Sequence, residues 1–237
     1  MDYRGHLRNF RALADAGLSY LRGKSFFEVE DEDYTFEHSS IVSAWEAEYF
    51  FANESEFYQD AIQEIEKGDV FYDVGANIGC FTCIMAGNGA NVYSFEPDSQ
   101  ALRELNRNLE LNSLSAEVYN YALSDSSESK PFMAKKGPDG KQRIDTKSET
   151  CVEAKRADEL DIEPPDIVKI DTEGHELRVL KGMSNLIQEK TPLLYVEAHG
   201  SKGFSEVQEY LEAINYETEL MTRRVDGSYM LKGEENK

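Results

Sequence analysis

The strongest constraint on the fold is a glycine motif that lies between an apolar run and a helical pattern. The apolar run extends from Val70 to Val74, ends at Gly75, and gives way to a helical pattern after Gly79. This order predicts a buried strand that turns directly into a helix. With Asp73, the two glycines form the motif Asp-x-Gly-x-x-x-Gly. Glycine at both positions removes side chains where a ligand would lie against the backbone.

A second predicted strand ends in an acidic residue. It runs from Val92 to Phe95, and Glu96 and Pro97 follow it, 17 positions after Gly79. In doubly wound α/β folds this position lies beside the tip of the first strand, where a carboxylate accepts hydrogen bonds from both hydroxyls of a ribose. The two features together predict a ligand that contains a nucleoside.

The spacing of the glycines narrows the identity of that ligand. A dinucleotide fold carries G-x-G-x-x-G, whereas this chain has Asn77 near the expected middle glycine and no phosphate-binding lysine in this turn. Asp73 would repel a phosphate but suits a positive amino group. S-adenosylmethionine has a ribose, an ammonium and a sulfonium, and no phosphate. The pattern therefore favours this cofactor over an ordinary strand–turn–helix with an acidic tip.

The sequence also resembles the FkbM family of S-adenosylmethionine-dependent methyltransferases. The likeness covers about two-thirds of the chain in the family's order, and its most specific part is Lys-Ile-Asp-Thr-Glu-Gly-x-Glu at 169–176. The matching segments are Glu54-x-Glu56, 68–79, 95–97, 122–125, 157–160, 167–177, 180–182 and 196–199.

The resemblance implies transfer of a methyl group from S-adenosylmethionine to a hydroxyl oxygen of a small molecule or glycan. Gly75, Ala76 and Gly79 would form the loop under the methionine moiety, Glu96 would hold the ribose, and the segment 122–123 would border the adenine. The full expected cofactor-binding set is Glu54, Asp73, Gly75, Ala76, Asn77, Gly79, Glu96, Pro97, Ala122, Leu123 and Asp171.

Strand and helix patterns alternate through most of the chain, which predicts an α/β fold with a doubly wound, mostly parallel sheet. A hairpin signal at Asp226-Gly227 joins the last two strands, so we expect seven strands as in a class I methyltransferase. We expect strands near 69–74, 91–96, 116–121, 166–171, 192–198, 216–222 and 228–232, and helices near 56–66, 78–87, 98–111, 175–189 and 204–214.

Two regions depart from the alternation. Residues 1–52 are expected to form an N-terminal helical extension to a methyltransferase domain at 53–237, with helices near 7–21 and 44–51 and strand character at 26–34. The basic amphipathic helix near 7–21 would dock on its own domain or contact a membrane surface or partner. Residues 125–150 are turn-rich and lysine-rich, with short runs that would form an added hairpin. They are either a solvated loop or a substrate-side lid.

Composition excludes some classes of protein. The chain has 237 residues and a formal net charge of −21, which would repel a phosphate backbone and argues against nucleic acid as a partner. Acids spread along the chain favour a salt-adapted, halophilic protein over an ordinary acidic one. No apolar run is long enough for a transmembrane segment. Three cysteines without an export signal favour the cytoplasm, and Cys80 and Cys83 are expected to pack a helix onto the sheet.

A second chemical centre is predicted where the fourth strand ends. Asp171 lies at the carboxyl end of that strand, where such folds bind ligands, and Lys169 faces the same side. A lysine in an apolar strand needs a partner, and Asp171 is the neighbouring candidate. His175 would be a general base near neutral pH, or a solvated histidine at a helix start. We therefore expect Asp171, His175 and Lys169 to be the catalytic residues.

The neighbouring acids have simpler expected roles. Glu173 and Glu176 lie in or near the first turn of the next helix, where the helix dipole favours negative charge. Glu197 and His199 end the following strand and would line the same crevice. A metal site formed by Asp171, Glu173, Glu197 and His199 is conceivable, but the spacings match no recognised metal signature, so none is predicted.

Three other functions stay open on the sequence alone. A nucleotide-dependent oxidoreductase lacks its G-x-G-x-x-G motif here. A non-catalytic protein that binds the cofactor or a glycan has no sequence feature against it. An RNA methyltransferase would carry Asn/Asp-Pro-Pro-aromatic where Asp-Thr-Glu-Gly stands at 171–174. The acceptor and the oligomeric state are not readable.

Overall fold

The computed structural model describes residues 24–29, 32–37, 55–133, 143–144, 150–224 and 227–236. The helices expected near 7–21 and 44–51, the residue Glu54 and most of the lysine-rich part of 125–150 lie outside these residues. No helix in the described part of the chain is long and apolar enough to cross a membrane.

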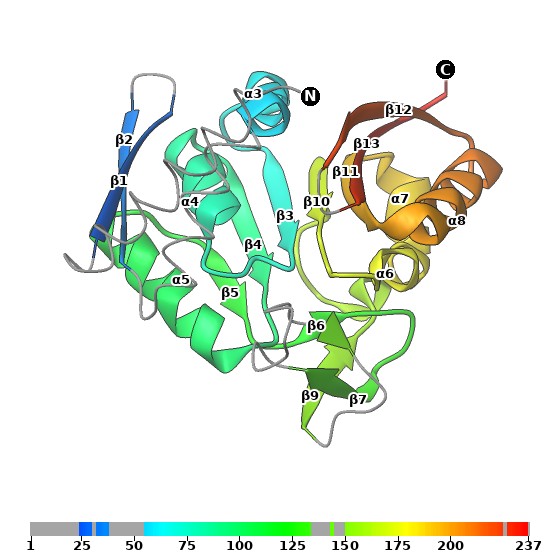
Figure 1. Cartoon of the computed structure of the whole chain (residues 1–237), viewed down its shortest axis with the longest axis horizontal. Coiled ribbons are helices and arrows are strands. Elements are labelled where there is room, and N and C mark those ends of the chain that lie inside the picture. Colours follow the sequence, from blue (N-terminus) through cyan, green and yellow to red (C-terminus); the bar gives the residue numbers. More distant parts are fainter. Residues whose placement is uncertain are drawn as a thin grey trace.

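The core of the molecule is a seven-stranded sheet, which confirms the predicted fold class (Figure 1). The strands from β11 to β5 run parallel to their neighbours, whereas β13 pairs antiparallel with both β11 and β12. The strand order across the sheet is β12-β13-β11-β10-β3-β4-β5. Their bounds are β3 Val70–Val74, β4 Asn91–Phe95, β5 Glu117–Tyr119, β10 Ile167–Ile170, β11 Leu193–His199, β12 Tyr216–Arg223 and β13 Ser228–Glu235.

Helices cover both faces of this sheet because each face carries its own apolar cluster. On one face lie α3 (Ser55–Glu64), α4 (Cys80–Gly87) and α5 (Ser99–Leu111), packed against Phe71 and Val92. Cys80 and Cys83 are buried free cysteines of α4 in this cluster, as predicted. On the other face lie α6 (Glu176–Gly182), α7 (Ser184–Lys190) and α8 (Gly200–Ala213).

The single helix predicted at 175–189 is in fact two helices, with a break at Met183. Asp158 explains the second start, because its carboxylate accepts hydrogen bonds from the backbone N–H groups of Asn185 and Leu186, both at 3.1 Å. These contacts satisfy donors that the first turn of a helix leaves unpaired. Asp158 comes from the short 3₁₀ helix η1 (Ala157–Glu159), which is far from α7 in the sequence.

A smaller sheet lies beside the ends of β4 and β5 and contains β6 (Ala122–Leu123), β7 (Glu128–Met133), β8 (Arg143–Ile144) and β9 (Cys151–Lys155) (Figure 1). The hairpin predicted within 125–150 is confirmed by the antiparallel pairing of β7 with β8. The strand predicted at 116–121 is shorter, because the chain leaves the main sheet after Tyr119 and pairs with β9 instead.

A second hairpin precedes the main domain, formed by β1 (Lys24–Val29) and β2 (Glu32–Glu37). The description of 1–52 as a helical extension is therefore wrong for this part, whereas the strand character predicted at 26–34 is confirmed. Both strands contain two aromatic residues, and such residues favour extended backbone. Phe36 is fully buried in the cluster that also contains Leu105 of α5, so the hairpin packs on that face of the domain (Figure 1).

Candidate active-site crevice

The expected site residues converge at the carboxyl ends of the parallel strands. Gly75 follows β3, Glu96 follows β4, Asp171 follows β10, and His199 ends β11. Parallel neighbours place all of these ends at one edge of the sheet, which is where open α/β sheets bind ligands.

The two glycines of the first turn have a packing role that the sequence did not reveal. Gly75 has φ 78°, and a Cβ atom there would lie 1.8 Å from the backbone oxygen of Asp171. Gly79 has φ 85°, and its Cβ would lie 2.7 Å from Leu105. Protein atoms therefore already occupy the space that these glycines leave. Both positions need glycine for backbone conformation and for close packing.

Glu96 is held by the backbone of its own and the neighbouring turn. Its two carboxylate oxygens accept hydrogen bonds from the N–H groups of Asn77, at 2.9 Å, and Asp98, at 2.7 Å, and the residue is only 3% exposed. Asn77 adopts a left-handed conformation (φ 51°) that presents this N–H. The carboxylate is thus fixed at the tip of β4 before any ligand binds.

Asp73 is buried below the turn in a polar network. It is 0% exposed, it accepts a hydrogen bond from Thr82 at 2.8 Å, and it lies 3.2 Å from the ammonium of Lys169. Asp171, the partner suggested by the sequence, is farther from that ammonium, at 3.9 Å. Lys169 also donates to the Gly75 carbonyl at 2.9 Å. Lys169 is therefore a buried cation that links β10 to the end of β3 and the glycine turn through Asp73 and the Gly75 carbonyl.

His199 stands at the centre of a cluster of carboxylates. Its Nε2 atom lies 3.1 Å from Glu173 and 4.0 Å from Asp171, while its Nδ1 atom lies 3.0 Å from Glu176. Burial by itself would lower the pKa of His199, but the hydrogen bond that the ring donates to Glu176 and the nearby carboxylates outweigh it and raise the pKa to about 9. Without a competing cation the ring is an imidazolium at neutral pH.

Glu197 belongs to the edge of this cluster. Its carboxylate pairs with Arg224 at 2.6 Å, accepts a hydrogen bond from Ser228 at 2.7 Å, and lies 3.7 Å from His199. In contrast, one oxygen each of Asp171 and Glu173 and a ring nitrogen of His199 lie within 4.8 Å of one another. These three atoms are the metal-ligating group that the described residues offer here.

Glu176 is the positioning residue that the sequence reasoning did not identify. It is 2% exposed, and one of its oxygens accepts hydrogen bonds from the backbone N–H of Gly174, at 2.7 Å, and from His199. The same oxygen lies 3.3 Å from the N–H of Thr172. Glu176 therefore shapes the loop between β10 and α6 and orients the imidazole. The segment 169–176 carried this signal as a motif, but the partner His199 is 23 positions away.

His175 points to a different set of partners. Its Nε2 atom lies 2.8 Å from the hydroxyl of Ser124, which itself donates to Asp125 at 3.1 Å. When the hydroxyl proton is directed to Asp125, the ring donates from Nε2 and its lone pair is on Nδ1. Burial, helped by the cations of Arg178 and Lys130, lowers the pKa of His175 to about 4. The ring is neutral near pH 7 and a weak base.

The remaining expected contacts are Pro97, Ala122 and Leu123. Pro97 is partly exposed beside Glu96, and the other two are buried in β6, where they pair with Ala154 and Lys155. The smaller sheet thus reaches the crevice directly, because Ser124 joins the end of β6 to His175.

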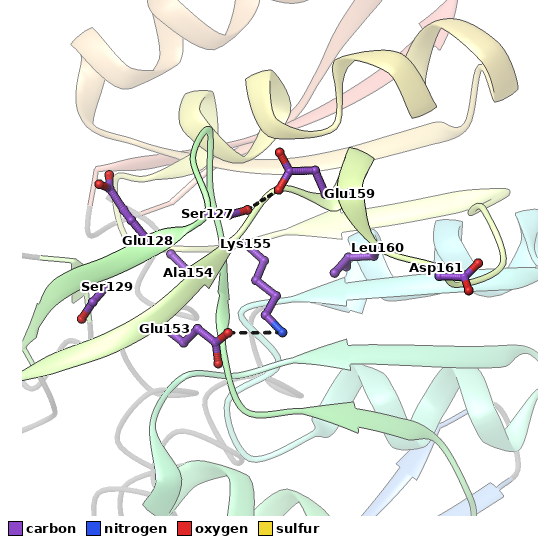
Figure 2. Close-up of a pocket in the computed structure, with 9 residues that line it drawn as sticks. All are labelled: Ser127, Glu128, Ser129, Glu153, Ala154, Lys155, Glu159, Leu160 and Asp161. Atoms are coloured by element: carbon purple, nitrogen blue, oxygen red, sulfur yellow. Dashed lines mark hydrogen bonds and ion pairs between the residues drawn. The ribbon is translucent and has the colours of Figure 1, made fainter.

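A cavity of about 510 Å³ opens on the smaller sheet, away from the glycine turn. Figure 2 shows acidic side chains around it, with the ammonium of Lys155 3.3 Å from Glu153 and the hydroxyl of Ser127 bonded to Glu159. Such a surface disfavours an anionic ligand. The lining residues are Ser127, Glu128, Ser129, Glu153, Ala154, Lys155, Glu159, Leu160 and Asp161.

Known proteins with similar sequences are methyltransferases. Residues 73–218 match the family model described as the methyltransferase FkbM domain. A hexuronic acid methyltransferase, AglP, of Haloferax volcanii is 29% identical over 97% of this chain and 96% of its own length.

Solved structures share the fold. Methyltransferase FkbM from Methylobacillus flagellatus KT superposes with a TM-score of 0.59 at 18% identity, and the match covers 95% of this chain and 59% of that chain. A Pyrococcus abyssi tRNA (uracil-54, C5)-methyltransferase superposes with a TM-score of 0.52 at 14% identity, and the match covers 90% of this chain and 44% of that chain. A family model that spans more than half of the residues, on the seven-stranded sheet described above, places this chain in the FkbM methyltransferase family.

Proposed function

We propose that this protein transfers a methyl group from S-adenosylmethionine to an oxygen of a uronic acid in a glycan. The observation that carries the proposal is the match to a hexuronic acid methyltransferase over nearly the whole length of both chains. The halophilic source of that relative also agrees with the net charge of −21. A cytoplasmic location remains a prediction.

The geometry at β3 and β4 supports the cofactor. The carboxylate of Glu96 lies at the tip of β4, where a ribose binds in folds of this kind, and two backbone N–H groups hold it there. The turn at 75–79 would pass beneath the methionine moiety. Two structural neighbours of the same fold are complexes with S-adenosyl-L-homocysteine and with AdoMet, respectively.

The ends of β10 and β11, on the other side of the crevice, would position the acceptor oxygen. Attack on the methyl carbon forms a C–O bond, and the S–C electron pair returns to sulfur, so the protein mainly aligns the oxygen and excludes water. A hydroxyl acceptor also loses a proton, and we assign Asp171, at the end of β10, to receive it. His175, through Nδ1, is the second candidate base.

Mass spectrometry of a uronic acid oligosaccharide incubated with the protein and S-adenosylmethionine tests the proposal. The expected product gains one methyl group in place of a hydrogen. The same oligosaccharide with its uronic acid replaced by the neutral hexose is the control for substrate class. Methylation of the neutral sugar alone would overturn the assignment of the uronic acid. A lack of cofactor binding by calorimetry would overturn the proposed activity itself.

A further inference from the structure

We propose that Asp171, Glu173 and His199 form a binding site for one divalent cation. One carboxylate oxygen from each acid and a ring nitrogen of His199 lie within 4.8 Å of one another. The Nε2 atom is 3.1 Å from Glu173 and 4.0 Å from Asp171. Ligands about 2.1 Å from an octahedral ion are about 3.0 Å apart when adjacent and about 4.2 Å apart when opposite. The two distances from Nε2 are therefore close to those between ligands of one ion.

The orientation of His199 is an observation independent of the acids. Its Nδ1 atom donates to Glu176, and the carboxylate of Glu176 is itself fixed by the backbone N–H of Gly174. Metal-binding histidines typically donate their second ring N–H to a carboxylate in this way, which fixes the ring and makes the other nitrogen a better ligand. This arrangement directs Nε2 at Asp171 and Glu173.

The charges nearby fit a cation as well. Four carboxylates lie within 4.0 Å of a single imidazole ring, although Glu197 among them already pairs with Arg224. The ammonium of Lys169 lies 3.9 Å from Asp171 but only 3.2 Å from Asp73. A divalent ion would offset the repulsion between Asp171 and Glu173. Carboxylates suit Mg²⁺ and Mn²⁺ whereas imidazole suits transition metals, so Mn²⁺ fits this mixed donor set best.

The site would also resolve how an acidic protein holds an anionic sugar. Three protein ligands leave about three positions of an octahedral ion for water or for acceptor oxygens. Carboxylate and hydroxyl oxygens of a uronic acid are suitable ligands, so the cation would bridge the acceptor to Asp171 beside the cofactor. This last step rests on the proposed function, whereas the metal site does not.

Electron paramagnetic resonance measures Mn²⁺ binding directly, because the signal of free Mn²⁺ is sharper than that of protein-bound Mn²⁺ and its loss reports the bound fraction. The full chain, stripped with a chelator and held in molar potassium chloride to screen diffuse attraction, is titrated with Mn²⁺. We expect one tight site per chain, which Mg²⁺ displaces at higher concentration. Glu173→Gln should weaken binding by about 10–100-fold or more, the range that loss of even an outer partner produces.

The matched control is Glu110→Gln, which removes the same charge from an exposed acid of α5 that pairs with Arg107. It should bind Mn²⁺ like wild type. Equal affinity in wild type and Glu173→Gln would overturn the site, as would the absence of a tight site in wild type. A melting curve with and without Mn²⁺ guards against a misfolded variant, since wild type and Glu110→Gln should gain stability and Glu173→Gln should not. Mn²⁺ binding without methylation of a uronic acid would overturn only the proposed function.

Discussion

At the ends of β3 and β4, the carboxylate of Glu96 is fixed by two backbone N–H groups, whereas at the ends of β10 and β11 the ring of His199 is fixed by carboxylate side chains. The turn after β3 is held by backbone groups, namely the Asn77 N–H that contacts Glu96 and the Asp171 carbonyl against which Gly75 packs. The position of His199 depends on charges that distant segments bring together. The difference teaches that backbone contacts hold the proposed cofactor side, whereas side-chain charges hold the proposed acceptor side.

The largest expected effect tests the acceptor side. Asp171→Asn should keep the fold but lower the methyl-transfer rate by about 10²–10⁴-fold, because an amide neither accepts a proton nor balances a cation. The turnover rate at saturating cofactor is the measurement. Asp161→Asn, an exposed acid on the smaller sheet's cavity, is the control. Wild-type turnover in Asp171→Asn would place the reaction's base elsewhere, with His175 as the next residue to replace.

Replacement of glycines tests the rigidity of the cofactor side. Gly75→Ala should lower the free energy of unfolding by about 2–5 kcal/mol, because a left-handed φ is combined with a clash against Asp171. Gly174 also has a positive φ, of 99°, but a Cβ there meets nothing within 4 Å. Gly174→Ala should therefore cost only about 1–2 kcal/mol. Urea unfolding compares the two, and equal losses would show that the close approach at Gly75 is unimportant.

Removal of Glu96 tests cofactor binding. Glu96→Ala should weaken S-adenosylmethionine binding by about tenfold or more, since each hydrogen bond to a charged group contributes about 1.5–3 kcal/mol. Calorimetry measures the affinity, with Glu117→Ala on β5 as the control. If both variants bind as wild type does, the ribose lies elsewhere.

Salt should act on the acidic protein as a whole. Because the Debye length falls to about 3 Å at 1 M salt, self-repulsion from the net charge of −21 is screened. The melting temperature should rise by several degrees between low salt and molar potassium chloride, as a gain of 1 kcal/mol corresponds to about 2–4 °C at this size. A flat melting curve would assign the chain to ordinary acidic proteins.

A last test concerns the pH dependence of stability. The pKa of His175 is about 4 in the folded protein, below the ordinary histidine value of about 6.5, so the unfolded chain takes up a proton first as the pH falls. Wild type should therefore lose stability between about pH 6.5 and 4 relative to His175→Asn, and the difference should be constant above pH 7. Urea unfolding at several pH values measures it. Parallel curves would mean that His175 is solvated.

Local sequence was enough to predict much of this protein. The glycine turn, the strand that leads to Glu96, the alternation that builds the sheet and the hairpin within 125–150 all depend on neighbouring residues. These features follow from the periodicity of apolar residues, the positions of glycines and the residue types of turns, all of which are present within short segments. The family motif at 169–176 likewise singled out the segment whose acids Asp171, Glu173 and Glu176 lie beside His199.

Only the tertiary structure decided which side chains meet. Sequence spacing disfavoured a metal site, because Glu173 and His199 lie on separate elements, yet parallel β10 and β11 bring their ends to one edge. It also paired Lys169 with Asp171, whereas the neighbouring strand supplies the closer Asp73. The pKa values of the two histidines diverge for the same reason. Burial and charge at each ring come from segments far apart in the chain, so no local pattern could assign them.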